Sequence, residues 1–119
     1  MVYDPQNAKE EPALPEDTVF DGVIIDLKDG VSKDFVKNLD KWKGSPEQPC
    51  IEVGIEVLHN GKKYGFTQLF NYEVSEGQTT YSPHSNLGRF KNKYGELPNV
   101  GCQVKTMTDK DGFLRLKLD

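Results

Sequence analysis

The chain has 119 residues, with 15 Lys and Arg against 19 Asp and Glu, and a formal net charge of −4 at pH 7. This length allows one continuous hydrophobic core and is too short for two domains of ordinary size. No apolar run approaches the ~18 residues of a membrane-spanning helix, and the N-terminus lacks the basic start and apolar stretch of a secretory signal. We therefore expect a cytoplasmic protein without membrane association, in which Cys50 and Cys102 are reduced.

The first 17 residues differ in character from the rest of the chain. They hold five acidic side chains against Lys9 alone, so they carry the whole net charge of −4 and leave residues 18–119 neutral. Three prolines and no hydrophobic periodicity accompany this charge. We predict a flexible acidic tail over residues 1–17 and a single folded domain over residues 18–119. The tail either competes with an anionic ligand or serves only as a solubilising leader.

Five segments have the composition or alternation of β-strands, and they are 18–30, 50–58, 62–74, 99–108 and 112–118. In the first, Gly22 marks a bend or bulge, and the side chains expected on one face are Val19, Val23, Ile25 and Leu27. In the second, Glu52 and Glu56 are expected to point outward because they alternate with four apolar residues, Ile51, Val53, Ile55 and Val57.

The later strands are bounded by turn signals. Asn60-Gly61 predicts a tight hairpin between the second and third segments, and the residues DKDG predict another between the last two. In the third segment Leu69 falls out of register with the aromatic residues, which predicts a bulge near Gln68. In the last segment the apolar residues Leu114, Leu116 and Leu118 alternate with Arg115 and Lys117.

Residues 82–98 predict the one helix of the domain. Ser82 is a suitable N-cap, Gly95 suits a left-handed C-terminal position, and Pro98 prevents continuation. The apolar residues that share a helical face are Leu87, Phe90 and Tyr94.

The order of elements predicts an all-β fold with one helix. Three strands, a helix and two further strands, with a long kinked first strand, are the order of a five-stranded OB-fold Greek-key barrel with its helix between strands 3 and 4. An SH3-like barrel is the alternative, but it normally lacks a helix before its fourth strand.

The segments EDTVFDGVIIDLKDG, IEVGIEV and SNLGRFKNKYGELPNVGCQVKTMTDKDGFLRLKL resemble the small single-domain OB-fold proteins of archaea and phages, a group that includes single-stranded DNA-binding proteins. The resemblance spans residues 18–119 and includes an ending in which a Ser-x-Leu helix leads through Gly-x-x-Val into a final DGF strand. These motifs are structural. The resemblance therefore implies the fold strongly and nucleic-acid binding less strongly, and it assigns no base-stacking residues.

The sequence offers little for catalysis. His59 and His84 each lie beside a turn, and no serine or cysteine has the setting of a nucleophile. The DKDG stretch lacks the further oxygen ligands of a calcium loop. We expect no enzymatic activity, no metal and no cofactor.

Binding of single-stranded DNA, or RNA, with low sequence specificity is the function that the sequence favours. Proteins of this kind combine a basic groove with aromatic faces on which bases stack. The connection between the first two strands has four lysines against Asp34 and Asp40, interleaved with aromatic residues. The predicted stacking residues are Phe35, Trp42, Tyr64 and Tyr72. The predicted phosphate contacts are Lys37, Lys41, Lys43, Lys62, Lys63 and Arg89.

Other interpretations of these residues stay open. Phe35, Leu39 and Trp42 have helical spacing, so they could instead pack over an open end of the barrel. Glu52 and Glu56 would repel phosphates on the strand face where OB folds usually bind. The alternative function is a protein-interaction module or accessory subunit that docks a partner on the barrel face. The sequence does not determine the oligomeric state.

Overall fold

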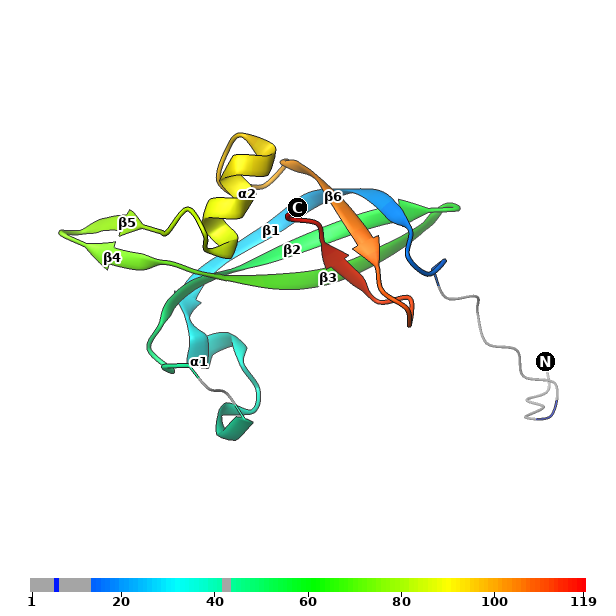
Figure 1. Ribbon diagram of the computed structural model, residues 1–119. Coiled ribbons are helices and arrows are strands. Elements are labelled where there is room, and N and C mark those ends of the chain that lie inside the picture. The colour runs from blue at the N-terminus through cyan, green and yellow to red at the C-terminus, as the bar shows by residue number, and fades with distance from the viewer. Residues whose placement is uncertain (1–5, 7–13, 42–43) are drawn as a thin grey trace.

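A computed structural model describes residues 6, 14–41 and 44–119. Five antiparallel strands in the order β3-β2-β1-β6-β7 form a sheet that curls into a nearly closed barrel (Figure 1). The strands are β1 (Val19–Val31), β2 (Pro49–His59), β3 (Lys62–Asn71), β6 (Gln103–Thr108) and β7 (Leu114–Leu116). The two edge strands, β3 and β7, contact each other along the open seam.

The remaining elements lie in the connections between these strands. α1 (Ser32–Phe35) and the 3-10 turn η1 (Leu39–Lys41) lie between β1 and β2. β4 (Glu73–Ser75) and β5 (Gln78–Thr80) form a hairpin that extends away from the barrel, and α2 (Asn86–Tyr94) follows it and packs against β3 (Figure 1). In the described part of the chain, no helix has both the length and the apolar character needed to span a bilayer.

Strand alternation determines which side chains enter the barrel. The prediction for β2 is confirmed, because Val53, Ile55 and Val57 are buried while Glu52 and Glu56 lie on the opposite face. β3 pairs with β2 in an unbroken register, so the bulge predicted near Gln68 is wrong. The main core cluster consists of Ile24, Val53, Ile55, Phe70, Leu87, Phe90, Cys102, Val104 and Leu116. Cys50 and Cys102 are both buried and free.

The inward face predicted for β1 is wrong at Val19 and Ile25, which are exposed, and correct at Leu27, which packs against the core, because the strand contains a bulge. The pairing with β2 shifts register between Ile24 and Asp26, so Ile25 is the extra residue and is 51% exposed. Such a residue changes which side chains point inward after it. Before the bulge Gly22 and Ile24 are buried, and after it Leu27 packs against the core. The bulge is not at Gly22, whose pairing with Val57 is regular.

The helix α2 begins three residues later than predicted. Ser85, and not Ser82, is the N-cap, because its Oγ accepts a hydrogen bond from the backbone N–H of Gly88 at 3.1 Å. The backbone carbonyl of Ser82 instead accepts bonds from the N–H and the hydroxyl of Ser85. At the other end Gly95 has the expected left-handed conformation, with φ of 82°.

Residues 14–17, which the sequence assigns to the tail, contact the barrel. The side chain of Leu14 is buried, and the Thr108 hydroxyl donates to the backbone carbonyl of Pro15 at 2.5 Å. The N–H of Asp17 also donates to the carbonyl of Asp109. These four residues of the predicted tail therefore pack on the barrel. Apart from residue 6, the rest of the predicted tail lies outside the described residues.

Candidate nucleic-acid interface

The structure separates the residues predicted to bind nucleic acid. Phe35, Lys37 and Lys41 lie in the connection 32–48, at the end of the barrel where β1 pairs with the start of β2. Lys62, Lys63 and Tyr64 begin β3, at the opposite end (Figure 1). The others in the structure are Tyr72, just after β3, and Arg89 on α2, while Trp42 and Lys43 lie outside the described residues.

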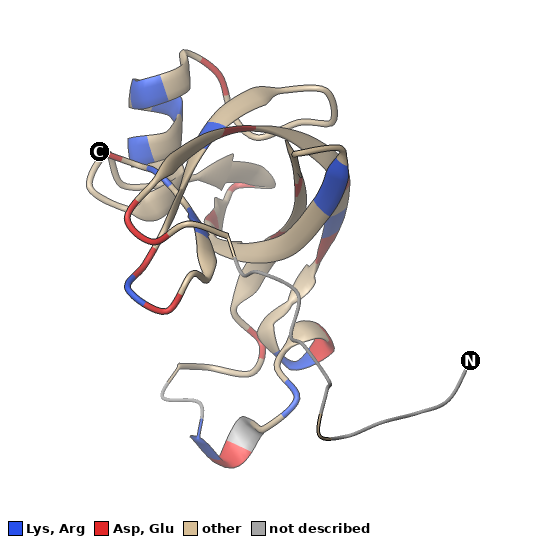
Figure 2. Ribbon diagram, turned by 90° about the vertical axis from the view of Figure 1, so that its right-hand side faces the viewer, with Lys and Arg blue, Asp and Glu red and all other residues tan. Residues whose placement is uncertain are grey.

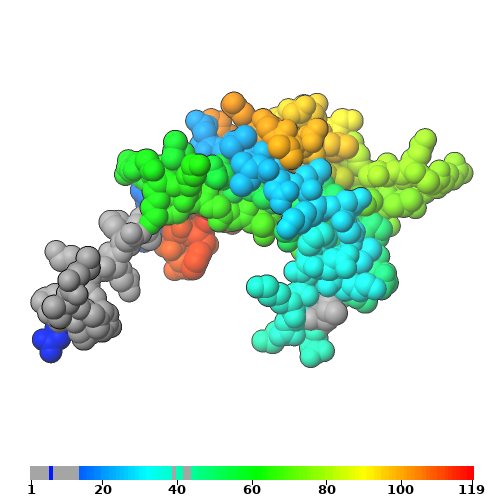
Figure 3. Space-filling view, turned by 180° about the vertical axis from the view of Figure 1, so that it is seen from behind, coloured from blue at the N-terminus to red at the C-terminus, as the bar shows by residue number. Residues whose placement is uncertain are grey.

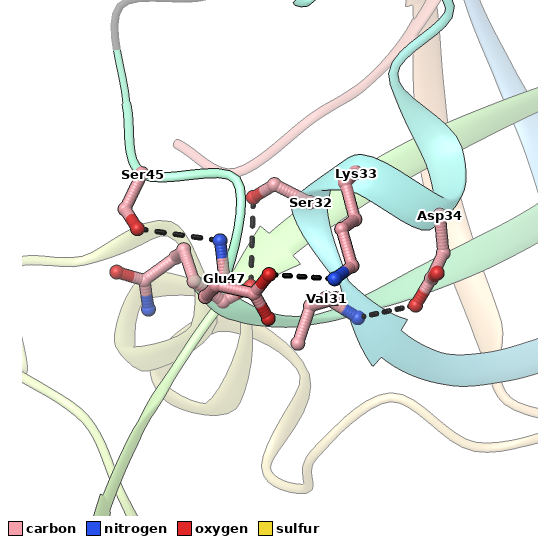
Figure 4. Close-up of polar contacts among 7 residues, drawn as sticks. Val31, Ser32, Lys33, Asp34, Ser45 and Glu47 are labelled. Atoms are coloured by element: carbon pink, nitrogen blue, oxygen red, sulfur yellow. Dashed lines mark hydrogen bonds and ion pairs between the residues drawn. The ribbon is translucent and has the colours of Figure 1, made fainter.

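The connection 32–48 is fastened to the barrel by polar contacts near α1 (Figure 4). The buried Ser32 donates its backbone N–H to the carbonyl of Gln48 at 3.0 Å. The ammonium of Lys33 donates to the carboxylate of Glu47 at 2.6 Å, and this hydrogen bond raises the pKa of Lys33. The first lysine of the connection is therefore already paired within the protein.

The described part of this connection is not basic overall. The charge of Glu47 balances that of Lys33. The other charged side chains of the connection are two acidic ones, Asp34 and Asp40, and two basic ones, Lys37 and Lys41. Phe35 is half-buried, and its ring lies so close to Gly30 that a Cβ at Gly30 would be 3.1 Å from ring carbons. The ring of Phe35 thus lies against β1 at Gly30. Lys37 and Lys41, which follow Phe35 in the same connection, are exposed.

Tyr72 is held in a structural contact. Its hydroxyl donates to Asp29 Oδ1 at 2.6 Å, and this bond is the main reason that the pKa of Tyr72 rises to about 12. The half-buried ring lines a small cavity of about 150 Å³ together with Ile51, Leu87 and Pro98. This contact links Asp29 of β1 to the residue that follows β3.

An open groove lies at the end of the barrel that bears Tyr64. We call it the mouth groove; it has a volume of about 460 Å³, and its main lining residues are Leu14, Tyr64, Phe66, Phe113 and Leu114. Tyr64 and Phe66 are half-buried, whereas Phe113 is 70% exposed. Three aromatic residues from two hairpins therefore line one groove. Figure 2 shows the backbone of the barrel from the side on which the β2–β3 hairpin lies.

The hydrogen bonds of the β6–β7 turn position Phe113 at this groove. The carboxylate of Asp109 accepts bonds from the N–H groups of Asp111 and Phe113, at 2.9 and 3.0 Å. Gly112 has φ of 81°, which glycine adopts without strain. The DKDG residues are thus a hairpin turn, as predicted, and the carboxylate of Asp109 is engaged within it.

Cations border the mouth groove. The ammonium of Lys62 lies 5.6 Å from the centroid of the Tyr64 ring, within reach of a cation–π contact. Lys63 is exposed on the adjoining outer face, and Lys110 is exposed in the β6–β7 turn. Asp111 is the acidic residue that lines the groove itself.

A second groove lies between α2 and β7, and we call it the α2–β7 groove. It has a volume of about 230 Å³ and is lined by Arg89, Met107, Arg115, Leu116, Lys117, Leu118 and Asp119. The Tyr94 hydroxyl joins helix to sheet, because it donates to the carbonyl of Lys117 at 2.5 Å and accepts from the N–H of Lys105 at 3.1 Å.

The sequence interpretation did not include four residues that line the two grooves, and they are Phe66, Phe113, Arg115 and Lys117. A signal for three of them was present in the alternation of the last segment. Leu116 is buried in the core, so the alternate residues Phe113, Arg115 and Lys117 are left for the other face.

The outer face of the central strands is acidic, as predicted. Glu52 lies opposite Lys28 in the register, and Asp26 is within 4.0 Å of the same lysine. Glu56 lies further along β2, beside Val23. A phosphate backbone would meet more carboxylates than cations there.

Metal ligands do not cluster in the described residues, where no three His, Cys, Asp or Glu side chains come together. Comparison of the chain with models of known families, with curated proteins and with solved structures gave no significant match.

Proposed function

We propose that this protein is a non-catalytic OB-fold module that binds single-stranded nucleic acid, DNA in preference to RNA, with low sequence specificity. The strand order β3-β2-β1-β6-β7, with α2 between β3 and β6, supports the OB assignment. In such barrels the ligand contacts the second and third strands and the loops that flank them. Here those loops correspond to the connection 32–48 and the β6–β7 hairpin.

The observation that carries the proposal is the aromatic lining of the mouth groove. Phe113 offers a largely free ring, and Tyr64 and Phe66 lie in the same groove. Each base that stacks on an aromatic ring contributes about 1 to 3 kcal/mol, whatever its identity. Lys62 and Lys63 stand at the start of the same strand as Tyr64, where they can contact the sugar–phosphate backbone.

The proposed site is centred on the mouth groove and not on the connection 32–48. That connection is one wall of a hollow that it forms with the β6–β7 hairpin, as Figure 3 shows from behind. Lys37 and Lys41 then contribute only to a strand long enough to cross the hollow. Tyr72 is left out, because its hydroxyl is bound to Asp29 and its ring lines the cavity beside α2.

The test is a titration of fluorescently labelled oligo-dT with the full chain at low and moderate salt. We expect binding whose logarithmic dependence on salt has a slope of about −0.7 for each phosphate contacted. A matched poly-U oligonucleotide measures the preference for DNA. Absence of oligo-dT binding at micromolar protein in low salt would refute the proposal.

A second candidate function is docking of a protein partner on the outer face of β1 and β2. The observation in its favour is that this face combines Glu52 and Glu56 with two exposed apolar residues, Ile25 at 51% and Leu58 at 65%. A stoichiometric protein captured after nuclease treatment, and lost on Leu58→Ser, would support it. Unchanged capture by Leu58→Ser would count against this face.

A further inference from the structure

The last strand presents an aromatic ring followed by two cations. Leu116 is buried in the core, and the residues Phe113, Arg115 and Lys117 occupy every second position around it. β7 itself spans Leu114–Leu116, and backbone bonds from Asp109 to Phe113 and from Lys117 to Lys105 continue its pairing with β6 by one residue at each end. Residues two apart on paired extended chain point the same way and are separated by about 6.8 Å. Phe113 and Arg115 are exposed, and Lys117 is half-buried. A stacking surface therefore continues directly into a row of positive charge.

Arg89 completes this positive surface from the helix. It lines the α2–β7 groove together with Arg115 and Lys117, and among the described residues none of these three side chains pairs with a carboxylate. Asp119 is the acidic residue in the groove, and its main-chain oxygen accepts a bond from Lys93 at 2.7 Å. Three cations thus line the groove with one acidic side chain, and Arg89 and Arg115 are exposed to solvent.

The two grooves adjoin across β7. Leu114 lines the mouth groove, while the next two residues, Arg115 and Leu116, line the α2–β7 groove. A ligand that extends from the mouth groove across this three-residue strand therefore comes next to the cations of the α2–β7 groove. The route over the outer face of β2 would instead pass Glu52 and Glu56.

We infer that a bound single strand continues from the mouth groove over β7 into the α2–β7 groove, where Arg89, Arg115 and Lys117 contact its phosphates. This inference rests on the proposed function. It adds a second, purely electrostatic subsite, so affinity should depend on the length of the strand. A short oligonucleotide fills the mouth groove alone, and a longer one reaches the cations.

The experiment compares two labelled oligo-dT strands, of about 4 and about 16 nucleotides, which bracket the site sizes of single OB folds. The test variant is Arg89→Gln/Arg115→Gln/Lys117→Gln. We expect it to bind the long strand at least about tenfold more weakly and to lower the salt slope by about 2, since each phosphate contact contributes about 0.7. Its binding of the short strand should be unchanged.

The matched control is Lys28→Gln/Lys91→Gln/Lys105→Gln, which removes the same charge from exposed lysines that line neither groove. It should leave the salt slope for the long strand unchanged. Thermal melting of both variants checks the fold. If the test variant keeps the affinity and slope of the parent protein, the second subsite is wrong while the proposed function stands. Failure of the parent protein to bind either strand refutes both.

Discussion

Phe113 is the residue on which the proposed binding most depends. Phe113→Ala should weaken oligo-dT binding by about 1 to 3 kcal/mol, the contribution of one stacked base. Because the ring is 70% exposed, the free energy of unfolding should change by less than about 0.5 kcal/mol. Fluorescence anisotropy measures the first quantity and denaturant unfolding the second.

Val100→Ala provides the matched control for Phe113, because it shortens another exposed apolar side chain outside the two grooves. It should change neither binding nor stability. Equal affinities of the Phe113→Ala variant and the parent protein would remove the mouth groove as the stacking site.

The role of Trp42, in base stacking or in packing, can be determined by two measurements on one variant. If its ring stacks on a base, Trp42→Ala should cost about 1 to 3 kcal/mol of binding, with little loss of stability. If it instead packs on the barrel end, truncation should cost about 3 to 5 kcal/mol of stability. Binding and thermal melting must be measured together, and a large fall in melting temperature would exclude Trp42 from the site.

Tyr72 predicts a dependence of stability on alkaline pH. Its pKa rises from 10.0 to about 12, chiefly because its hydroxyl donates to Asp29. The folded state therefore holds this proton more tightly than the unfolded state. The stabilisation is complete below pH 10 and is lost as the pH rises from 10 to about 12.

Tyr72→Phe should consequently be less stable than the parent protein below pH 10, and the difference should shrink toward pH 12. Urea unfolding at a series of alkaline pH values measures it, and subtracting the two curves removes the titration of the lysines. Asp29→Asn should reduce the same pH dependence. A difference that stays constant through this range would show that the Tyr72–Asp29 bond does not control it.

At the scale of elements, the packing of α2 depends on a glycine inside the helix. Gly88 is buried, and a Cβ there would lie 2.7 Å from the Cα of Pro83, too close for carbon atoms. Gly88→Ala gains up to about 1 kcal/mol of helix propensity but should be destabilising by about 1 to 3 kcal/mol through overpacking. Asn92→Ala, on the exposed side of α2, is the control and should be neutral or slightly stabilising. A Gly88→Ala variant that is more stable than the parent would show that the segment before α2 shifts freely.

Elements were predictable where local pattern and burial coincide. β2 was found by its alternation because three successive inward positions, Val53, Ile55 and Val57, are buried. β1 was misread because a single inserted residue, Ile25, changes the phase of the strand, and residue identity alone does not mark where pairing shifts. The helix was recognised, yet Ser82 and Ser85 are both competent caps, and only the bond to Gly88 decides between them.

At the scale of the whole molecule, the structure separates the predicted site residues because they were chosen from charges that are close in sequence. Lys33 in the connection 32–48 is paired with Glu47, which comes much later in the same connection. The residues that gather at the mouth groove come instead from two hairpins far apart in the chain, with Tyr64 in one and Phe113 in the other. These two residues come together only because the barrel closes, so a pattern of residues close in sequence cannot predict that they share a groove.

The charge of the first residues should also act on the whole molecule. Leu14 is buried and lines the mouth groove, so residues 1–13 are attached at its edge. They carry Asp4, Glu10 and Glu11 against Lys9, and a tethered acidic segment has a high effective concentration near its attachment point. Deleting residues 1–13 should therefore strengthen oligo-dT binding about two- to tenfold at low salt, and salt should abolish the gain by screening.

Two further variants separate this electrostatic effect from the loss of chain. Asp4→Asn/Glu10→Gln/Glu11→Gln keeps the length of the segment and should give the same gain as the deletion. Removing residues 1–17 instead discards Leu14 and the bond from Thr108 to Pro15, so it should lower the melting temperature. Competition titrations with oligo-dT measure the affinities of all three variants. Affinity unchanged by both the deletion and the neutralised segment, at every salt concentration, would leave residues 1–13 with a solubilising role alone.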